Sequence, residues 1–394
     1  MIPKYYEFFS PVKIISGLKA LENLPYELDA LGAFRPILIT DQGVTRAGLV
    51  QQVVDTFADS HAVIGAVYDK VPQDSSSAVV NEIAAIFNQA GCDSIVAVGG
   101  GSVIDTAKGV NIVVTENSDD LLKFSGAEML KKPMKPFIVI PTTAGTGSEV
   151  TCVAVISDPS RNLKMSFTSN FLYPRAAILD PRMTLTLPPM ITAATGMDAL
   201  THAVEAYISM QKNPLSDAYA WKAIEIIAKT LPGVVKDGND RKGRLALANA
   251  STMAGIAFSN SMVGIVHNLG HATGGVCHVP HGIAMSIFLP FGLQYNLKKV
   301  SAEIGELLLP LAGEEVFSKT PQEARAEKVI EAIHDLKDEL FELCRLPRTL
   351  KEANVVREKL PEIANAALND GASTYNVEEV DYNDALAVLE RAYE

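Results

Sequence analysis

The histidines of this 394-residue chain are concentrated in one region. Five of the seven lie there, namely His202, His267, His271, His278 and His281. Asp198 precedes His202 by four residues, so both side chains should project from one face of a helix. A carboxylate oxygen and three imidazole nitrogens suit a divalent cation and leave a position open for substrate. The pattern therefore predicts a metal site, although any one histidine alone is more often a structural residue.

Helices are expected to position these side chains. Asp198 and His202 fall in the helical segment 192–209, and Glu205 lies one turn further on as a supporting or structural acid. An uncharged segment, 245–266, is long enough to cross a membrane, but its Asn, Ser and Thr content favours a helix buried in a helical domain. We place His267 and His271 at the end of that helix.

The start of a further helix is expected at His281, which lies between Pro280 and Gly282. His278 is interpreted as a residue at the rim of the site. His61 and His334 are interpreted as ordinary surface residues.

The first half of the chain alternates β-branched runs with helical segments, which predicts a parallel sheet covered by helices. The expected strands are 36–40, 62–67, 94–98 and 137–140, with a helix over 79–90. After residue 180 long apolar-periodic segments predominate, and Pro188-Pro189 begins a helix. We therefore expect an α/β nucleotide-binding domain over residues 1–182 and an all-α domain over residues 183–394.

A glycine turn follows the expected strand 94–98. Gly99, Gly100, Gly101 and Ser102 lead into a predicted helix, where free N–H groups and the helix dipole favour an anion such as a diphosphate. Ser102 and Asp105 have the spacing of an N-cap and its capping-box partner. The turn is not the usual GxGxxG dinucleotide fingerprint, and alone it is equally consistent with a simple turn.

A second loop of small and hydroxyl residues follows the expected strand 137–140. It runs from Pro141 to Thr151, and both loops should lie at the carboxyl ends of parallel strands, where ligands bind. Asp41 directly follows the strand 36–40. Its carboxylate could accept hydrogen bonds from an adenosine ribose and would repel a 2′-phosphate, which favours NAD over NADP, but a turn-forming role is nearly as plausible.

Composition narrows the class of protein. The net charge of −12 and the absence of a Lys/Arg cluster argue against nucleic acid as a partner. The N-terminal residues lack the pattern of a signal peptide, so we expect a cytoplasmic protein that has no membrane span. The four cysteines form no CxxC pair and are interpreted as free thiols.

Four segments together resemble the iron-containing (group III) alcohol dehydrogenases. They are GGGSVID at 99–105, PTTAGTGSEVT at 141–151, TGMDALTH at 195–202, and HNLGH at 267–271 followed by PHG at 280–282. Their order and spacing match the family from about residue 10 to residue 365. The resemblance implies a dehydroquinate-synthase-like fold, in which a cleft between the two domains holds metal and substrate.

The resemblance also implies roles for individual residues. Asp198, His202, His267 and His281 match the metal ligands, and His271 matches a nearby histidine assigned to proton transfer or nicotinamide contact. The positions that match dinucleotide contacts are Asp41, Gly99, Gly100, Gly101, Ser102, Thr142, Thr143, Thr151 and Lys164. Near the C-terminus Asn376-Val377-Glu378 replaces the common Asn-Pro-Arg or Asn-Pro-Lys, so that edge should differ in shape or partner.

The expected reaction is NAD-dependent oxidation of a primary alcohol, diol or hydroxyacid, and the reverse reduction. The metal is expected to be Fe²⁺, with Zn²⁺ or another divalent cation as alternatives, and acts as a Lewis acid on the substrate oxygen. A homo-oligomer, a dimer or larger, is expected from the resemblance, and residues 5–15 could supply a shared strand.

Two alternatives remain open at this point. One is a metal-dependent lyase or synthase on the same fold, which would need basic residues to hold an acidic sugar. No Lys or Arg lies within 198–210 or 245–293. The other is a non-catalytic dinucleotide sensor, which would not need a complete set of metal ligands.

Overall fold

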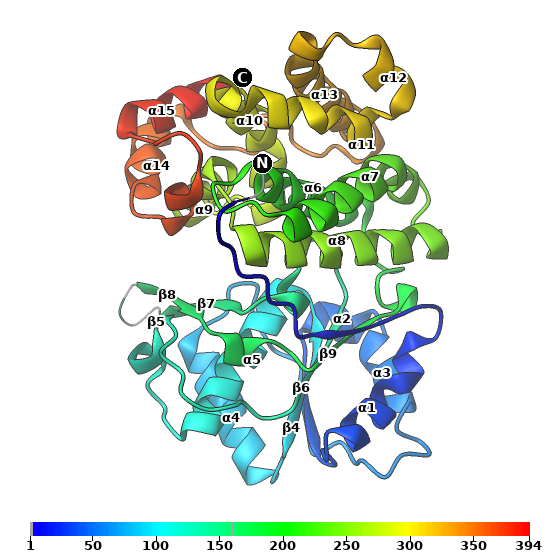
Figure 1. Cartoon of the computed structure of the whole chain (residues 1–394). Helices are drawn as coiled ribbons and strands as arrows, with labels where there is room; N and C mark the ends of the chain where they lie inside the picture. The colour runs from blue at the N-terminus through cyan, green and yellow to red at the C-terminus, as the bar shows by residue number, and fades with distance from the viewer. Residues whose placement is uncertain (1–2, 159–160, 162) are drawn as a thin grey trace. The chain divides into compact units, whose positions relative to one another are not determined.

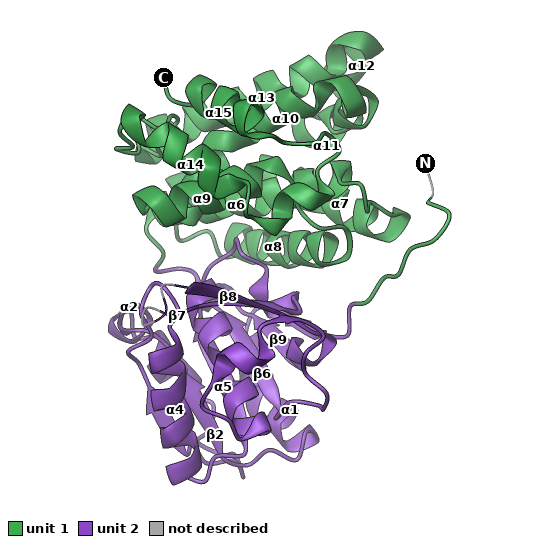
Figure 2. Cartoon of the chain, turned by 90° about the vertical axis from the view of Figure 1, so that its left-hand side faces the viewer, with its two compact units in different colours: residues 1–9, 187–394 green, residues 10–186 purple. Residues whose placement is uncertain are grey.

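The computed structural model describes residues 3–158, 161 and 163–394 (Figure 1). The chain forms two compact units, coloured separately in Figure 2. We call residues 10–186 the α/β unit, and residues 1–9 with 187–394 the helical unit. Each unit buries its own apolar side chains.

In the described part of the α/β unit, six parallel strands form one sheet in the order β1-β9-β6-β4-β2-β3. The strands are β1 (Lys13–Ser16), β2 (Pro36–Ile39), β3 (Ala66–Tyr68), β4 (Ser94–Gly99), β6 (Phe137–Pro141) and β9 (Ala176–Leu179). A smaller sheet, in the order β5-β8-β7, contains β5 (Gly126–Ala127), β7 (Val153–Asp158) and β8 (Leu163–Thr168). The expected parallel sheet is confirmed.

The central strands are apolar on both faces because helices cover both faces. Ile37 and Ile95 pack with residues of α4 and α5, whereas Leu38 and Val96 pack with residues of α1 and α3. The α-helices of this unit are α1 (Leu24–Ala30), α2 (Gln42–Arg46), α3 (Leu49–Asp55), α4 (Ser77–Gln89) and α5 (Gly101–Glu116).

The strand predicted over 62–67 is wrong for most of its length. Only β3, Ala66–Tyr68, pairs in the sheet, at its edge. Val63 is 60% exposed, so the apolar run that suggested a buried strand lies mostly at the surface.

The strands β1, β7, β8 and β9 were not predicted from the sequence. In β8 the less buried face carries the polar residues Lys164, Ser166 and Thr168, which weakens the apolar signal of that strand.

The helical unit is built around α6 (Pro189–Ile208), which packs against α7, α8 and α10. Nearly every side chain of α6 from Thr192 to Ile208 is buried. The remaining α-helices are α7 (Pro214–Lys236), α8 (Arg241–Ser261), α9 (Ile265–Cys277), α10 (His281–Glu306), α11 (Leu308–Ala312), α12 (Glu314–Lys319), α13 (Arg325–Cys344), α14 (Leu360–Ala367) and α15 (Tyr382–Arg391). Within the described residues, none of the helices combines the length and apolar character needed to span a membrane.

The uncharged segment forms two helices rather than one. The chain leaves the helical conformation after Ser261: Met262 has φ 67° and ψ 179°, and α9 begins only at Ile265. His267 and His271 therefore lie at the start and middle of α9, and the prediction that they end a single long helix is wrong. No charge, proline or change of periodicity marks the break, so hydrophobic pattern alone did not reveal it.

A buried lysine joins α5 to the loop that follows β6. The Nζ atom of Lys108 donates to the carbonyl oxygens of Ser148 (3.0 Å), Thr151 (2.9 Å) and Val153 (2.7 Å), and to Oγ1 of Thr151 (3.0 Å). Lys108 is fully buried. Three residues earlier on α5, Asp105 accepts the backbone N–H of Val155 at 3.0 Å. These contacts fix residues 148–155 against the helix that begins at the glycine turn.

The replacement Lys108→Met should destabilise the α/β unit. Methionine is close in volume but cannot donate, so buried carbonyl oxygens lose their partner, which costs about 3 kcal/mol. Lys222→Met is the matched control, since Lys222 is exposed and its ammonium bonds Glu225 alone among the described contacts. Urea unfolding followed by circular dichroism measures both variants. An unchanged midpoint for Lys108→Met would show that the buried ammonium contributes no stability.

Candidate functional site

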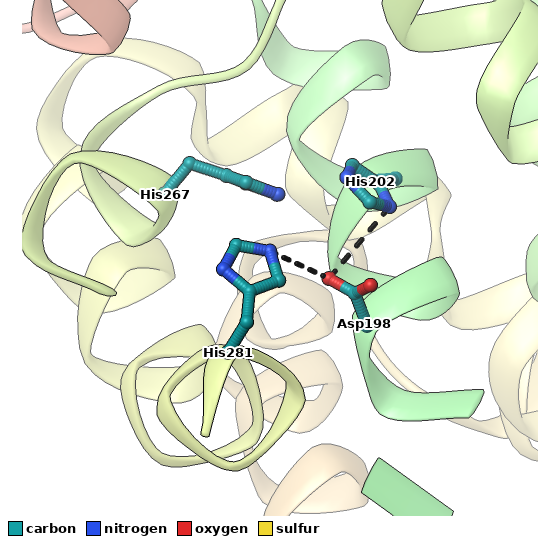
Figure 3. Close-up of side chains that lie close together, drawn as sticks. All are labelled: Asp198, His202, His267 and His281. Carbon is teal, nitrogen blue, oxygen red and sulfur yellow. Dashed lines mark ion pairs between the residues drawn. The ribbon is translucent and has the colours of Figure 1, made fainter. Parts of the chain in front are cut away.

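Four side chains from three helices converge in the helical unit. Asp198 and His202 come from α6, His267 from α9 and His281 from the first residue of α10. One ligand atom from each lies within 4.8 Å of the others. Figure 3 shows the three imidazole rings gathered around the Asp198 carboxylate. The structure thus brings together the four residues predicted as metal ligands.

The unsatisfied polar atoms of this cluster fit a cation. Nδ1 of His202 and Nε2 of His267 are buried and have no hydrogen-bond partner among the described residues. Oδ1 of Asp198 likewise makes no well-directed hydrogen bond, although Nε2 of His281 lies 3.2 Å away. Buried polar atoms normally find partners. Lone pairs of nitrogen and oxygen that face one point without a donor are suited to a divalent metal.

Burial and neighbouring charges shift the pKa values of the cluster side chains toward the protonation states that can bind a metal. It lowers the pKa of His202 to about 3 and that of His267 well below its usual value. Burial alone would raise the pKa of Asp198, but the adjacent His202 and His281 hold it well below its ordinary range. At neutral pH the cluster therefore offers the Asp198 carboxylate and neutral imidazoles at His202 and His267, which are the forms that bind metals.

The carboxylate of Glu205, one turn beyond His202, contacts the ring nitrogen of His267 that does not face the cluster. Its Oε2 atom lies 2.6 Å from Nδ1 of His267, and its carboxylate accepts the backbone N–H groups of Val266 (2.7 Å) and His267 (3.3 Å). Burial raises the pKa of Glu205 to about 7, and these backbone donors act in the opposite direction. The contact with Nδ1 leaves Nε2 as the ring nitrogen that faces the cluster.

Two glycines allow the helices to approach closely enough. A Cβ atom on Gly282 would lie 2.4 Å from the carbonyl oxygen of Ala194, so only glycine lets the start of α10 lie against α6 and bring His281 to Asp198. A Cβ atom on Gly264 would lie 2.6 Å from Oδ1 of Asn376. Glycine there allows polar side chains to reach the start of α9.

His271 lies beside the cluster but outside the group of four. Its ring stacks on His281 with centroids 5.3 Å apart, and its Nδ1 atom lies 2.9 Å from Oδ2 of Asp370. Its side chain is 43% exposed. His278, the residue that caps the end of α9, is exposed and not part of the group.

The side of the site near His202 is apolar. Phe258 of α8 stacks on the His202 ring with centroids 4.3 Å apart and planes inclined by 17°. This aromatic face shields the buried imidazole of His202 from water and leaves a hydrocarbon surface beside it.

The glycine turn begins a helix whose N-terminus has no side-chain cap. Gly100 is the extended N-cap residue, and α5 starts at Gly101. The predicted capping box of Ser102 and Asp105 is wrong, because the N-cap is Gly100 and the helix begins two residues earlier than expected. The Ser102 hydroxyl donates to the carbonyl oxygen of Gln73 instead, and Asp105 accepts from Val155. The first amide N–H groups of α5 are thus left without a side-chain cap.

The second predicted loop lies next to this turn. Strands β4 and β6 pair in parallel with Gly99 opposite Pro141, and the backbone N–H of Thr142 donates to the carbonyl oxygen of Gly99 at 3.1 Å. A Cβ atom on Gly100 would lie 3.2 Å from Oγ1 of Thr143. The two predicted dinucleotide segments therefore meet at the carboxyl ends of neighbouring strands.

The structure shows the neighbours or exposure of three other residues that the sequence predicts to contact the cofactor. Asp41 is the N-cap of α2, where its Oδ1 atom accepts the backbone N–H of Val44 at 2.9 Å. The hydroxyl of Thr151 is buried and bonded to Lys108. Lys164 is exposed on β8 of the smaller sheet. Their contacts with a dinucleotide stay predictions.

Sequence reasoning missed two residues close to the histidines. Asp370 contacts His271, and Asn376 accepts the backbone N–H of Ile265 at 3.2 Å. The two contacts join residues 99 and 111 positions apart, so only tertiary structure reveals them. Asn376 had been noted only for the unusual residues that follow it.

Known proteins similar to this chain share its full length. An NAD-dependent methanol dehydrogenase from Bacillus methanolicus is 34% identical over 98% of this chain and 99% of its own. A crystal structure of 1,3-propanediol oxidoreductase, 33% identical, matches with a TM-score of 0.94 over 99% of this chain and 100% of its own. A sulfoacetaldehyde reductase from Bifidobacterium kashiwanohense in complex with NAD⁺, 26% identical, matches with a TM-score of 0.87 over 99% of each chain.

Two family models match nearly all of the chain. Residues 11–181 match the model for iron-containing alcohol dehydrogenase, and residues 192–393 match the C-terminal model of the Fe-containing alcohol dehydrogenase family. Together with the relatives above, the matches establish that this chain belongs to the iron-containing alcohol dehydrogenase family.

Proposed function

We propose that this protein is an NAD-dependent alcohol dehydrogenase that oxidises an alcohol to an aldehyde or ketone and catalyses the reverse reduction with a divalent metal. The observation that carries the proposal is the convergence, beside His281, of buried atoms of Asp198, His202 and His267 that lack a hydrogen-bond partner among the described residues. Family membership supports the same reaction class. The relatives named for methanol and 1,3-propanediol act on small alcohols.

Asp198, His202, His267 and His281 would hold the metal, which we propose to be Fe²⁺, with Zn²⁺ as an alternative of similar ligand preference. A divalent cation in this position supplies Lewis acidity toward a substrate oxygen. The chain supplies a buried carboxylate at Asp198 and neutral imidazoles at His202 and His267. Glu205 and the start of α9 hold His267 in one orientation.

His271 is our proposed proton acceptor. It lies beside His281 without joining the ligand group, and it is partly exposed, so a proton taken from a substrate hydroxyl has a route to solvent. A nicotinamide accepts the hydride from the carbinol carbon in this class of reaction. We propose that the Gly99–Ser102 turn, Thr142 and Thr143 bind the diphosphate of NAD and that Asp41, Thr151 and Lys164 complete the cofactor contacts.

The proposed substrate is a small alcohol, diol or hydroxyacid. Phe258 presents an aromatic face next to His202. No Lys or Arg lies within 198–210 or 245–293, which cover most of the helical residues around the cluster. This absence of cations disfavours the lyase or synthase alternative, because an acidic sugar would need them.

We also propose that the enzyme is cytoplasmic and forms a homo-oligomer. The acidic composition and the free cysteines fit a reducing compartment. Strand β1 lies at the edge of its sheet, and an edge strand offers unpaired backbone groups to a second copy. Tyr5, at 77% exposed, precedes that strand.

The reaction can be tested with metal-stripped protein reconstituted anaerobically with Fe²⁺ or Zn²⁺. With NAD and a panel of primary alcohols, diols and hydroxyacids, absorbance at 340 nm should rise only in the reconstituted samples. NADP should support a lower rate if Asp41 repels the 2′-phosphate. Binding of metal and NAD without turnover of any alcohol or aldehyde would refute the dehydrogenase proposal.

Single replacements separate metal ligands from the neighbouring histidine. We expect His267→Ala and His281→Ala to lose bound metal and with it all activity, because each removes one of four ligands. His271→Ala should keep stoichiometric metal and turn over at least 100-fold more slowly. Metal content by plasma mass spectrometry, measured beside kcat, distinguishes these outcomes. Loss of metal from His271→Ala would show that its assigned role is wrong.

A further inference from the structure

An acidic residue far along the chain contacts the histidine beside the metal cluster. Oδ2 of Asp370 lies 2.9 Å from Nδ1 of His271, a separation of 99 residues in sequence. The side chain of Asp370 is 25% exposed, so most of its surface is protected from water. Neither residue belongs to the four-residue ligand group.

The Asp370 carboxylate is itself held in place. Its second oxygen, Oδ1, accepts the backbone N–H of Ala372 at 2.8 Å and caps the short 3-10 helix η8 (Gly371–Tyr375). The Ser373 hydroxyl donates to the carbonyl oxygen of Asp370 at 3.0 Å. One oxygen therefore fixes the carboxylate and the other is directed to the imidazole.

The segment 370–376 is attached to α9 at both of its ends. Asp370 contacts His271 in the second turn of α9, and Oδ1 of Asn376 accepts the backbone N–H of Ile265, the first residue of α9. Asn376 and Asn296 of α10 exchange two side-chain amide hydrogen bonds, each of 2.9 Å. Two attachments hold the segment along the helix that carries His267 and His271.

The charge on Asp370 decides which way the hydrogen bond runs. Burial acts to raise the pKa of Asp370, but its hydrogen bonds with His271 and with the backbone N–H of Ala372 lower it below its usual value. An ionised carboxylate can only accept. Nδ1 of His271 is then the donor, and Nε2 keeps its lone pair.

We propose that Asp370 is a positioning residue for His271: it fixes the ring and its Nδ1–H tautomer so that Nε2 is available to take the hydroxyl proton of the substrate. The inference deepens the proposed dehydrogenase function and rests on it. In the step concerned, the substrate O–H bond breaks and an Nε2–H bond forms. The hydride leaves with its electron pair to the nicotinamide, and the proton passes from the exposed imidazole to water.

The test is a double-mutant cycle of Asp370→Asn and His271→Ala in the metal-loaded enzyme. Asparagine keeps an oxygen that can cap Ala372 but places an amide N–H₂ group, a donor, against Nδ1. Asp120→Asn is a matched control, because Asp120 likewise caps a 3-10 helix, η2 (Leu121–Phe124), through the backbone N–H of Leu122 and lies in the α/β unit. Asp370→Glu tests rescue by a second carboxylate.

We expect Asp370→Asn to lower kcat/KM by about 10-fold or more, the usual effect of removing a partner that orients a histidine. In the His271→Ala background the same replacement should change kcat/KM by less than about twofold, because Asp370 then has no imidazole to position. Metal content should stay stoichiometric, and Asp370→Glu should recover part of the rate. Asp120→Asn should match the wild type.

A second readout does not depend on turnover. Long-range ¹H–¹⁵N NMR of histidine-labelled, zinc-loaded protein should show His271 protonated at Nδ1 in the wild type and at Nε2 in Asp370→Asn. Equal rate losses with and without His271, or the same tautomer in both proteins, would overturn the role of Asp370. A wild type without metal-dependent turnover would instead overturn the proposed function.

Discussion

The buried Glu205 carboxylate makes the contact on which the proposed metal site depends most. It accepts backbone N–H groups from the first turn of α9 and contacts Nδ1 of His267 at 2.6 Å. A helix that starts inside a protein leaves N–H groups that need acceptors, and Gly264, the N-cap of α9, provides no side chain. Glu205 supplies that cap from α6, and the same carboxylate directs Nε2 of His267 at the cluster. The Glu205 carboxylate therefore both caps the start of α9 and orients the ring of His267.

The other helices complete the site around this contact. Helix α6 contributes Asp198, His202 and Glu205 from successive turns, so its own regularity spaces two predicted ligands and their support. Gly282 lets α10 begin against the carbonyl oxygen of Ala194, and Asn376 and Asp370 hold α9 from the opposite end of the sequence. All of these residues belong to the helical unit, so the metal cluster forms within one unit.

The sequence predicted most of this arrangement, and its failures have physical causes. The central strands and α6 were predictable because burial on both faces, or on the whole circumference, leaves long apolar runs. The break between α8 and α9 was not predictable, because the first N–H groups of α9 bond side chains distant in sequence: Val266 bonds Glu205, 61 residues away, and Ile265 bonds Asn376, 111 residues away. The helix at the glycine turn begins two residues earlier than predicted, because extended Gly100 is the N-cap in place of the expected Ser102 side chain. Long-range polar contacts leave no periodic signal.

The central claim is that Glu205 holds His267 as a ligand. Its most direct test is the affinity for Zn²⁺ or Fe²⁺ of Glu205→Gln, measured by competition with a chelator, beside Glu225→Gln, which changes a partly exposed carboxylate on α7 that pairs with Lys229. A glutamine has one acceptor oxygen and cannot satisfy both the helix start and Nδ1. The account predicts an affinity about 10–100-fold below the wild type for Glu205→Gln and no change for the control. A folded Glu205→Gln protein that binds metal as tightly as the wild type would contradict it.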